Sequence, residues 1–274
     1  MQTIGIAGCG TMGLPMAKRL QQAGFKVLGF DVREKAQFGS FAPHMLDSAR
    51  ALSQRCEVVI SVVRDQAQTE QLLFAEHGLI HNNGKMQVLL LSSTLDPNYA
   101  RALESRLPKT LCLLDAPMSG APIGAERGCL SFMLSGDEKQ LDKLMPVFTA
   151  MGQHFHRLGA AVGAGHTAKV LNNFSAAMSV AVTRQLIEMS EKLGLPQEQL
   201  LSVMNSSSGQ NWFSSGLDNI NWSRQGYEAE NTIGILEKDV NCFAQAVQDS
   251  ASEPLVALRH ALLDNLKELK PLEK

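Results

Sequence analysis

Three short stretches of the sequence combine residue types and spacings that could do chemistry. Gly8-Cys9-Gly10-Thr11-Met12-Gly13 has the spacing Gly-x-Gly-x-x-Gly. Lys169 and Asn173 are four residues apart in a predicted helix, so both side chains would face one ligand. Ser119-Gly120 follows a predicted strand, where a hydroxyl and backbone N–H groups can hold a carboxylate. Residues of these types could hold a phosphate-bearing cofactor and a small acid and could transfer a proton.

The glycine-rich stretch is typical of a dinucleotide site because of its surroundings. It follows an apolar run, Ile4 to Ala7, and precedes a helical pattern from Leu14 to Ala23. N–H groups at the start of a helix, together with the helix dipole, attract a pyrophosphate. The three glycines would provide a tight turn, close approach of the pyrophosphate and close packing of helix on strand. The alternative is a glycine-rich turn in an α/β protein of another kind.

The second predicted strand ends on an acid, Asp31, about 20 residues beyond the glycines. An acid here accepts hydrogen bonds from the adenosine ribose, and its charge repels the additional phosphate of NADP. Arg33 favours the opposite choice, because an arginine nearby can accommodate that phosphate. We therefore expect NAD as the preferred cofactor and NADP as the alternative, bound at Asp31, Val32 and Arg33 as well as at the glycines.

Composition excludes several classes of function. The chain has 274 residues, 45% of them hydrophobic, and a formal net charge of −2. That balance indicates a soluble globular protein without a nucleic-acid or membrane partner. No apolar run approaches the roughly 20 residues of a membrane span, and the first strand leaves no room for a targeting peptide. The 5 cysteines are scattered without metal spacing, which favours reduced thiols in a cytoplasmic protein and no metal site.

The pattern of apolar segments changes part-way along the chain. Up to residue 164, short apolar runs such as 57–63, 86–91 and 110–114 alternate with helical patterns. This alternation predicts an α/β fold, a Rossmann-type doubly wound parallel sheet, which residues 130–134 and 154–158 would extend. Residues 165–274 contain mainly helical patterns, beginning with a long one over 166–193. We expect an all-α C-terminal domain joined by a long interdomain helix, with the ligand in the cleft between the domains.

Taken together, these motifs resemble the β-hydroxyacid dehydrogenase family, which includes 3-hydroxyisobutyrate dehydrogenase and tartronate semialdehyde reductase. The similarity extends over nearly the whole chain. Besides the glycine motif it rests on a substrate-loop motif, a catalytic motif, a Lys-Asp segment and a Ser-Thr turn. Their residues are Asp115-Ala116-Pro117-Met118-Ser119-Gly120-Ala121, then Gly163-x-Gly165-x-x-x-Lys169-x-x-Asn172-Asn173, then Lys238-Asp239, and Ser93-Thr94.

The resemblance implies a function and a role for each motif. The chain would exchange a hydride between nicotinamide and a small 3-hydroxy acid or its semialdehyde, within a fold that has a C-terminal domain of the 6-phosphogluconate dehydrogenase type. Lys169 would be the general acid/base, with Asn173 beside it. Ser119, Gly120 and Ala121 would bind the substrate carboxylate. Further cofactor contacts would come from Val63, Thr94 and Lys238. A homodimer or higher homo-oligomer is also implied.

The alternative for Lys169 is that it has no catalytic role and is a surface lysine on an amphipathic helix. At the level of function, the alternatives are an imine reductase-like enzyme and a non-catalytic dinucleotide-binding or sensor module. Two departures from the family pattern bear on the substrate and on assembly. Ala121 stands where the family usually has glycine, and its methyl group disfavours a positive φ. The sequence ends at Leu272-Glu273-Lys274, short of the family's usual ending, which leaves the last helix in doubt.

Overall fold

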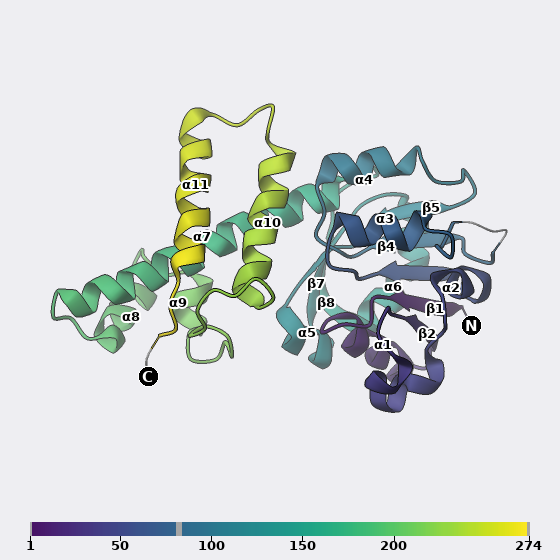
Figure 1. The fold of residues 1–274 in the computed structure, drawn as a ribbon, viewed down its shortest axis with the longest axis horizontal. Helices are drawn as coiled ribbons and strands as arrows, with labels where there is room; N and C mark the ends of the chain where they lie inside the picture. The colour runs from purple at the N-terminus through teal and green to yellow at the C-terminus, as the bar shows by residue number, and fades with distance from the viewer. Residues whose placement is uncertain (1, 81–83, 273–274) are drawn as a thin grey trace. The chain divides into compact units, whose positions relative to one another are not determined.

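The computed structural model describes residues 2–80 and 84–272. The chain divides into two compact units, Met1–Lys169 and Val170–Lys274, and Figure 1 shows their elements. Helix α7 (Ala164–Lys192) begins in the first unit and continues through the second. The domain boundary expected at residue 164 therefore stays a proposal.

The first unit is built on a parallel sheet with strand order β2-β1-β3-β4-β5. The strands are nearly continuous in apolar residues, as in sheets that helices cover on both faces. They are β1 (Thr3–Ala7), β2 (Lys26–Phe30), β3 (Val58–Ser61), β4 (Val88–Leu91) and β5 (Cys112–Asp115). The predicted doubly wound parallel sheet is confirmed.

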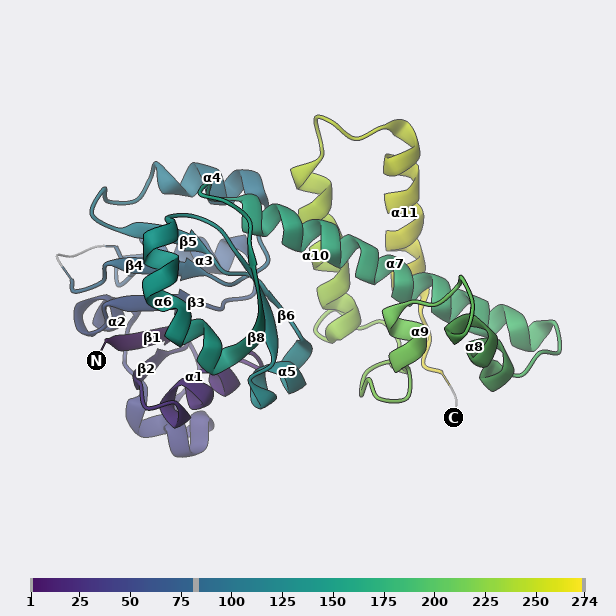
Figure 2. The same cartoon turned by 180° about the vertical axis from the view of Figure 1, so that it is seen from behind.

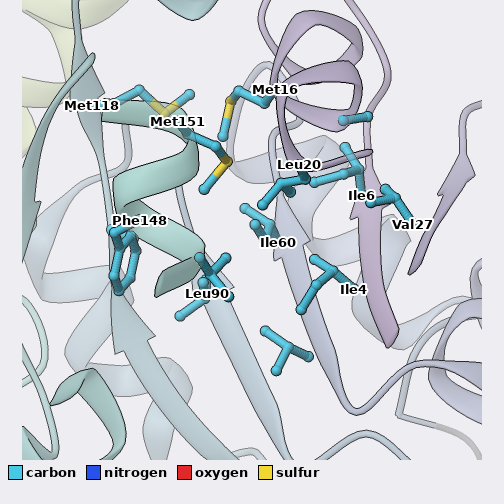
Figure 3. Packing of buried hydrophobic residues seen from close by; sticks show 14 of the residues in the cluster. Ile4, Ile6, Met16, Leu20, Val27, Ile60, Leu90, Met118, Phe148 and Met151 are labelled. Atoms are coloured by element: carbon cyan, nitrogen blue, oxygen red, sulfur yellow. The ribbon is translucent and has the colours of Figure 1, made fainter. Parts of the chain in front are cut away.

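Successive residues of each strand point to opposite faces of the sheet and so build two separate cores. Figure 3 shows the first core, where Ile4 and Ile60 of the sheet meet Met16 and Phe148. The helices on this face are α1 (Gly13–Gln22) and α6 (Glu138–Met151). The second core lies under α2 (Ala49–Arg55), α3 (Gln66–Phe74) and α4 (Pro97–Glu104).

Most helices of this unit begin at a side chain that accepts a hydrogen bond from the first turn. These capping side chains satisfy N–H groups that a helix start leaves without a partner. They are Ser48 for α2, Asp65 for α3, Asp96 for α4 and Asp137 for α6. Helix α1 differs, because its N-cap is Met12. A 3₁₀ segment, η1 (Lys35–His44), follows β2.

A second, three-stranded sheet corrects one expectation. Residues 130–134 and 154–158 were predicted to extend the parallel sheet, but β7 (Leu130–Leu134) and β8 (Gly152–Arg157) pair with each other and with β6 (Met118–Ser119). The chain turns back after β5, so β6 runs antiparallel to β7. Helix α5 (Ala121–Arg127) lies between β6 and β7 in the sequence.

The second unit is helical in the part that the structure describes. Beyond α7 its helices are α8 (Gln197–Asn205), α9 (Trp212–Gly216), α10 (Thr232–Ala246) and α11 (Glu253–Glu268). Figure 2 shows α10 and α11 side by side. They share a core with α7 in which Val180, Ile187, Phe213, Val240 and Leu266 are buried. The expected all-α C-terminal part is confirmed.

The end of the described chain is tied to the rest of this unit. Arg184 of α7 is 3% exposed, and its guanidinium donates to the backbone carbonyls of Ser223, Gln225 and Lys270. The N–H of Leu272 donates to the carbonyl of Arg224. The last helix, which the sequence left in doubt, is thus formed as α11 and followed by a docked segment. Glu273 and Lys274 lie outside the described residues.

Candidate active site

The glycine turn leaves β1 at the point where the strand order reverses. Because β1 lies between β2 and β3, the chain crosses from one side of β1 to the other as it passes from β2 to β3. Open α/β sheets bind ligands at the carboxyl ends of the strands at such a switch point. The turn that the sequence singled out therefore lies where a ligand site is expected.

Contacts around the three glycines match the three tasks of a dinucleotide-binding turn. Gly8 has φ +91°, and a Cβ there would lie 2.6 Å from the carbonyl oxygen of Val62. A Cβ on Gly13 would lie 1.9 Å from the carbonyl oxygen of Gly8, so only glycine lets the helix start this close to the strand. A Cβ on Gly10 would meet nothing within 4 Å, which leaves open space where a phosphate would approach.

The start of α1 suits an anion. No side chain caps it and its first turn contains no acidic residue, so the positive end of the helix dipole is not neutralised locally. A cavity of about 560 Å³ opens beside the turn. Among its lining residues are Cys9, Gly10, Thr11, Lys18 and Arg33. This part of the chain fits the pyrophosphate of a dinucleotide, held by backbone N–H groups with cationic side chains nearby.

Asp31, immediately after β2, faces the glycine turn and pairs with Arg33. Its Oδ2 accepts from the N–H of Cys9 at 2.8 Å, and its Oδ1 lies 3.0 Å from Nε of Arg33. Burial raises the pKa of Asp31, but the hydrogen bonds and charge of Arg33 and the N–H of Cys9 outweigh it and lower the pKa. Asp31 is thus an ionised acceptor at the end of β2. Val32 between them is exposed.

Two other predicted cofactor residues lie at the same edge of the sheet. Val63 follows β3 and Thr94 follows β4, and both are partly buried. The carboxyl ends of the neighbouring parallel strands β1, β3 and β4 thus bring these residues to the edge where the glycine turn lies. The predicted cofactor contacts of the first unit therefore gather on one edge.

The predicted substrate loop has an unusual backbone. Ser119 ends β6, Gly120 has φ +137° and Ala121 has φ +54°. Ala121 is the non-glycine residue with positive φ among the residues that the structure describes. An L-residue in this region costs about 1–2 kcal/mol. The sequence correctly indicates a backbone here that suits glycine, and the structure shows that alanine adopts it nevertheless.

Lys169 lies in the second turn of α7 and is only 7% exposed, which is rare for a lysine. The start of this helix is fixed by a buried carboxylate that was not among the predicted site residues. Asp115, the last residue of β5, accepts from the N–H of Gly163 at 2.6 Å, from the N–H of Gly165 at 3.1 Å and from the Ser135 hydroxyl at 2.6 Å. The signal was present, because Asp115 opens the substrate-loop motif and the glycines open the lysine motif.

A second polar cluster lies inside the second unit. Nδ2 of Asn173 donates to Oδ2 of Asp239 at 2.5 Å, and Nζ of Lys238 lies 2.7 Å from Oδ1 of the same carboxylate. Asn173 and Asp239 are buried, and Lys238 is mostly buried. The structure thus joins the predicted residues Asn173 and Lys238 through Asp239, which was not a predicted site residue although it lies in the Lys-Asp motif.

Within residues 2–80 and 84–272, no three His, Cys, Asp or Glu side chains are grouped so that they could hold a metal ion. Over the same residues, no helix combines the length and the apolar character that a membrane crossing requires.

Comparison with known families covers both units. Residues 3–183 match the NAD binding domain of 6-phosphogluconate dehydrogenase. Residues 163–270 match the NAD-binding domain of NADP-dependent 3-hydroxyisobutyrate dehydrogenase. The chain belongs to the β-hydroxyacid dehydrogenase family. Membership makes it an NAD(P)-dependent oxidoreductase that acts on CH–OH groups, with NAD or NADP as its cofactor.

Individual members of the β-hydroxyacid dehydrogenase family align along most of their length. A 3-hydroxyisobutyrate dehydrogenase of Pseudomonas aeruginosa is 35% identical over 277 residues, covering 96% of this chain and 91% of that protein. An NAD-dependent L-serine dehydrogenase of the same organism is 34% identical, covering 92% and 87%. The solved structure of Mycobacterium tuberculosis 3-hydroxyisobutyrate dehydrogenase with L-serine has a TM-score of 0.77 at 26% identity, covering 98% and 96%.

Proposed function

We propose that this chain oxidises a small 3-hydroxy acid to the corresponding semialdehyde, and catalyses the reverse reduction, with Lys169 as the general acid/base. The observation that carries the proposal is a lysine buried to 7% exposure in a helix whose start is held at the carboxyl end of β5. A lysine is rarely buried to this extent in a protein, and a buried amine within reach of a bound alcohol can exchange a proton with it.

The chemistry divides between the chain and its cofactor. In the oxidation, the C–H and O–H bonds of the alcohol break and a C=O bond forms. Lys169 would take the hydroxyl proton, and it would return a proton to the oxygen during reduction. When bound, the nicotinamide takes up the hydride from the carbinol carbon. Asn173 follows Lys169 by four residues in one helix, so the two side chains project from one helix face and would orient the reacting oxygen together.

The remaining predicted residues would bind the carboxylate of the substrate and the pyrophosphate and adenosine ribose of the cofactor. Ser119, Gly120 and Ala121 would hold the substrate carboxylate through the serine hydroxyl and backbone N–H groups. The turn from Gly8 to Gly13 would hold the pyrophosphate, and Asp31 the adenosine ribose. The relatives named for L-serine and 3-hydroxyisobutyrate support a substrate with one carboxylate and a nearby primary alcohol.

The test is reduction of NAD⁺ and of NADP⁺, followed at 340 nm with a panel of small acids. The panel contains 3-hydroxyisobutyrate, L-serine, glycerate, 4-hydroxybutyrate, glycolate and 2,3-dihydroxypropanesulfonate. We expect turnover with one of the carboxylates, and kcat/KM about tenfold higher with NAD⁺ than with NADP⁺, because the ionised Asp31 repels the additional 2′-phosphate of NADP⁺.

Two results would contradict this proposal. If both cofactors bind but no panel member and no matching semialdehyde turns over, a non-catalytic dinucleotide-binding role replaces it. If cyclic imines are reduced while every hydroxy acid is inert, the chain works as an imine reductase. A preference for NADP⁺ would leave the reaction in place and overturn only the cofactor preference, assigning the decisive contact to Arg33.

We also propose that the chain works as a homo-oligomer, in the cytoplasm, where its 5 cysteines stay reduced. The support for assembly is an apolar stripe on α7 formed by Met178, Val182, Leu186 and Met189. The last three are exposed, and their spacing places them on one side of the helix, away from the buried Val180. A second copy of this stripe would cover it.

Val182→Glu combined with Met189→Glu is expected to convert this oligomer into a monomer, because it places two like charges in an apolar interface. The mass in solution, measured by light scattering during size-exclusion chromatography, checks this. Glu188→Gln, which changes an exposed charge of α7 outside the stripe, should leave the mass unchanged. A parent protein that is already monomeric, or an oligomer that survives both glutamates, would refute the stripe as the interface.

A further inference from the structure

The carboxylate of Asp115 is a junction of three chain segments. It is fully buried and ends β5, the strand that leads through Ala116 and Pro117 into the substrate loop. Its Oδ2 accepts from Ser135, which follows β7, and from Gly163 and Gly165 at the start of α7. The segments that carry Ser119 and Lys169 thus share one anchor.

The residues around the Asp115 carboxylate are closely packed. The Ser135 hydroxyl, besides donating to Asp115, accepts from the N–H of Gly165 at 2.9 Å. A Cβ on Gly165 would lie 2.5 Å from the carbonyl oxygen of Met133 and 2.8 Å from Cβ of Asp115, so the helix start cannot approach with any other residue. Nδ1 of His166 lies 3.0 Å from Oδ1 of Asp115, and neither side chain is exposed.

The charge of Asp115 is retained despite its burial. Burial raises the pKa of this carboxyl, but the interactions with His166, Ser135 and the N–H of Gly163 outweigh it and hold the pKa below its usual range. An ionised carboxylate on the first N–H groups of α7 also complements the helix dipole. The anchor is therefore strong as well as closely fitted.

We propose that Asp115 is a positioning residue that fixes Lys169 relative to Ser119, by holding the start of α7 on the strand that enters the substrate loop. This inference rests on the proposed function, because it takes Lys169 as the proton-transfer group. Lys169 lies one turn beyond Gly165, so a shift of the helix start is passed directly to its side chain. A displacement of 1 Å can cost about 10²-fold in rate.

The competing interpretation is an ordinary helix cap, which contributes stability and nothing else. The same unit contains a matched control, because Asp137 accepts from the N–H of Gln140 and caps α6, and it lies two residues beyond Ser135. Loss of either cap should lower stability. Only loss of the Asp115 anchor should lower kcat, if that carboxylate positions the reacting lysine.

The experiment compares the full-length Asp115→Asn, Ser135→Ala, Asp137→Asn and Lys169→Met variants. The readouts are kcat, KM, the Kd for NADH from its fluorescence, and Tm. We expect Asp115→Asn to lower kcat at least about tenfold, with NADH affinity within about twofold of the parent, because the glycine turn is untouched. Asp137→Asn should lower Tm and leave kcat unchanged. Ser135→Ala should lower kcat by about three- to tenfold.

The outcomes distinguish the positioning role of Asp115 from the proposed function of Lys169. A folded Asp115→Asn variant with parental kcat, or an Asp137→Asn variant that loses as much kcat, overturns the positioning role while a Lys169→Met defect still upholds the proposed function. Parental turnover in Lys169→Met overturns the proposed function and the positioning role with it. If Asp115→Asn does not fold, Ser135→Ala decides, and parental kcat in that variant rejects the proposal.

Discussion

Replacing Lys169 by methionine is expected to lower kcat by about 10²- to 10⁴-fold, the range that general acid–base catalysis contributes. Methionine keeps much of the length and apolar stem of lysine, so the buried position stays filled. What is lost is the amine that, in the proposed function, would move the proton to and from the alcohol oxygen. Steady-state kinetics with the best panel substrate measures the loss, and NADH fluorescence should show an unchanged Kd.

A second lysine of the same helix serves as the control. Lys192, at the other end of α7, is exposed and pairs with Glu188, so Lys192→Met should retain parental kcat. Added primary amines should restore part of the activity of Lys169→Ala, because a free amine can enter the space and carry the proton. A Lys169→Met variant that turns over at more than about a tenth of the parental rate would exclude the assigned role.

Arg184→Met is expected to lower the free energy of unfolding of the second unit by about 3–5 kcal/mol. The guanidinium holds the carbonyls of Ser223, Gln225 and Lys270, and methionine leaves all three without their donor. Burial, together with the nearby charge of Arg224, lowers the pKa of Arg184 to about 10, so the group is charged at neutral pH. Urea unfolding followed by circular dichroism should show the midpoint fall by about 1–3 M.

Arg224→Met provides the comparison for Arg184. Arg224 is about one-third exposed and pairs with Asp218 at 3.4 Å, an arrangement worth at most about 1 kcal/mol. Its backbone carbonyl, which accepts from Leu272, is unaffected by the substitution. Equal midpoints for the two variants would show that the buried guanidinium does not hold the loop and the tail together.

Local patterns predicted the parts of this fold that depend on neighbouring residues. The apolar runs predicted the five parallel strands, and the helical pattern over 166–193 predicted α7 to within two residues of its bounds. The glycine spacing led to a turn at the topological switch of the sheet. Each of these features depends on residues that are close in the sequence. A strand buried on both faces requires a short apolar run, and a helix that starts beside a crowded turn requires glycines in that turn.

What the sequence did not predict depends on contacts between distant residues. The strands that pair with β7 are determined by where the chain turns after Asp115. The sequence therefore did not predict that β7 belongs to a second sheet. The Asp115 anchor joins residues 20 and 48 positions apart, and the Asn173–Asp239 bond joins residues 66 positions apart. The partners of Arg184 likewise lie 39, 41 and 86 residues along the chain, so no local pattern indicates them.

The backbone of Ala121 has a consequence for how this enzyme could diversify. Glycine at this position would relieve a left-handed alanine, a gain of about 1 kcal/mol that the greater freedom of glycine in the unfolded chain largely offsets. Codons for alanine and glycine differ by a single nucleotide. A lineage can therefore exchange the methyl group of this residue in one mutational step that is nearly neutral for folding. If the loop binds the substrate carboxylate as proposed, that step would change the room for the acid with little change in stability.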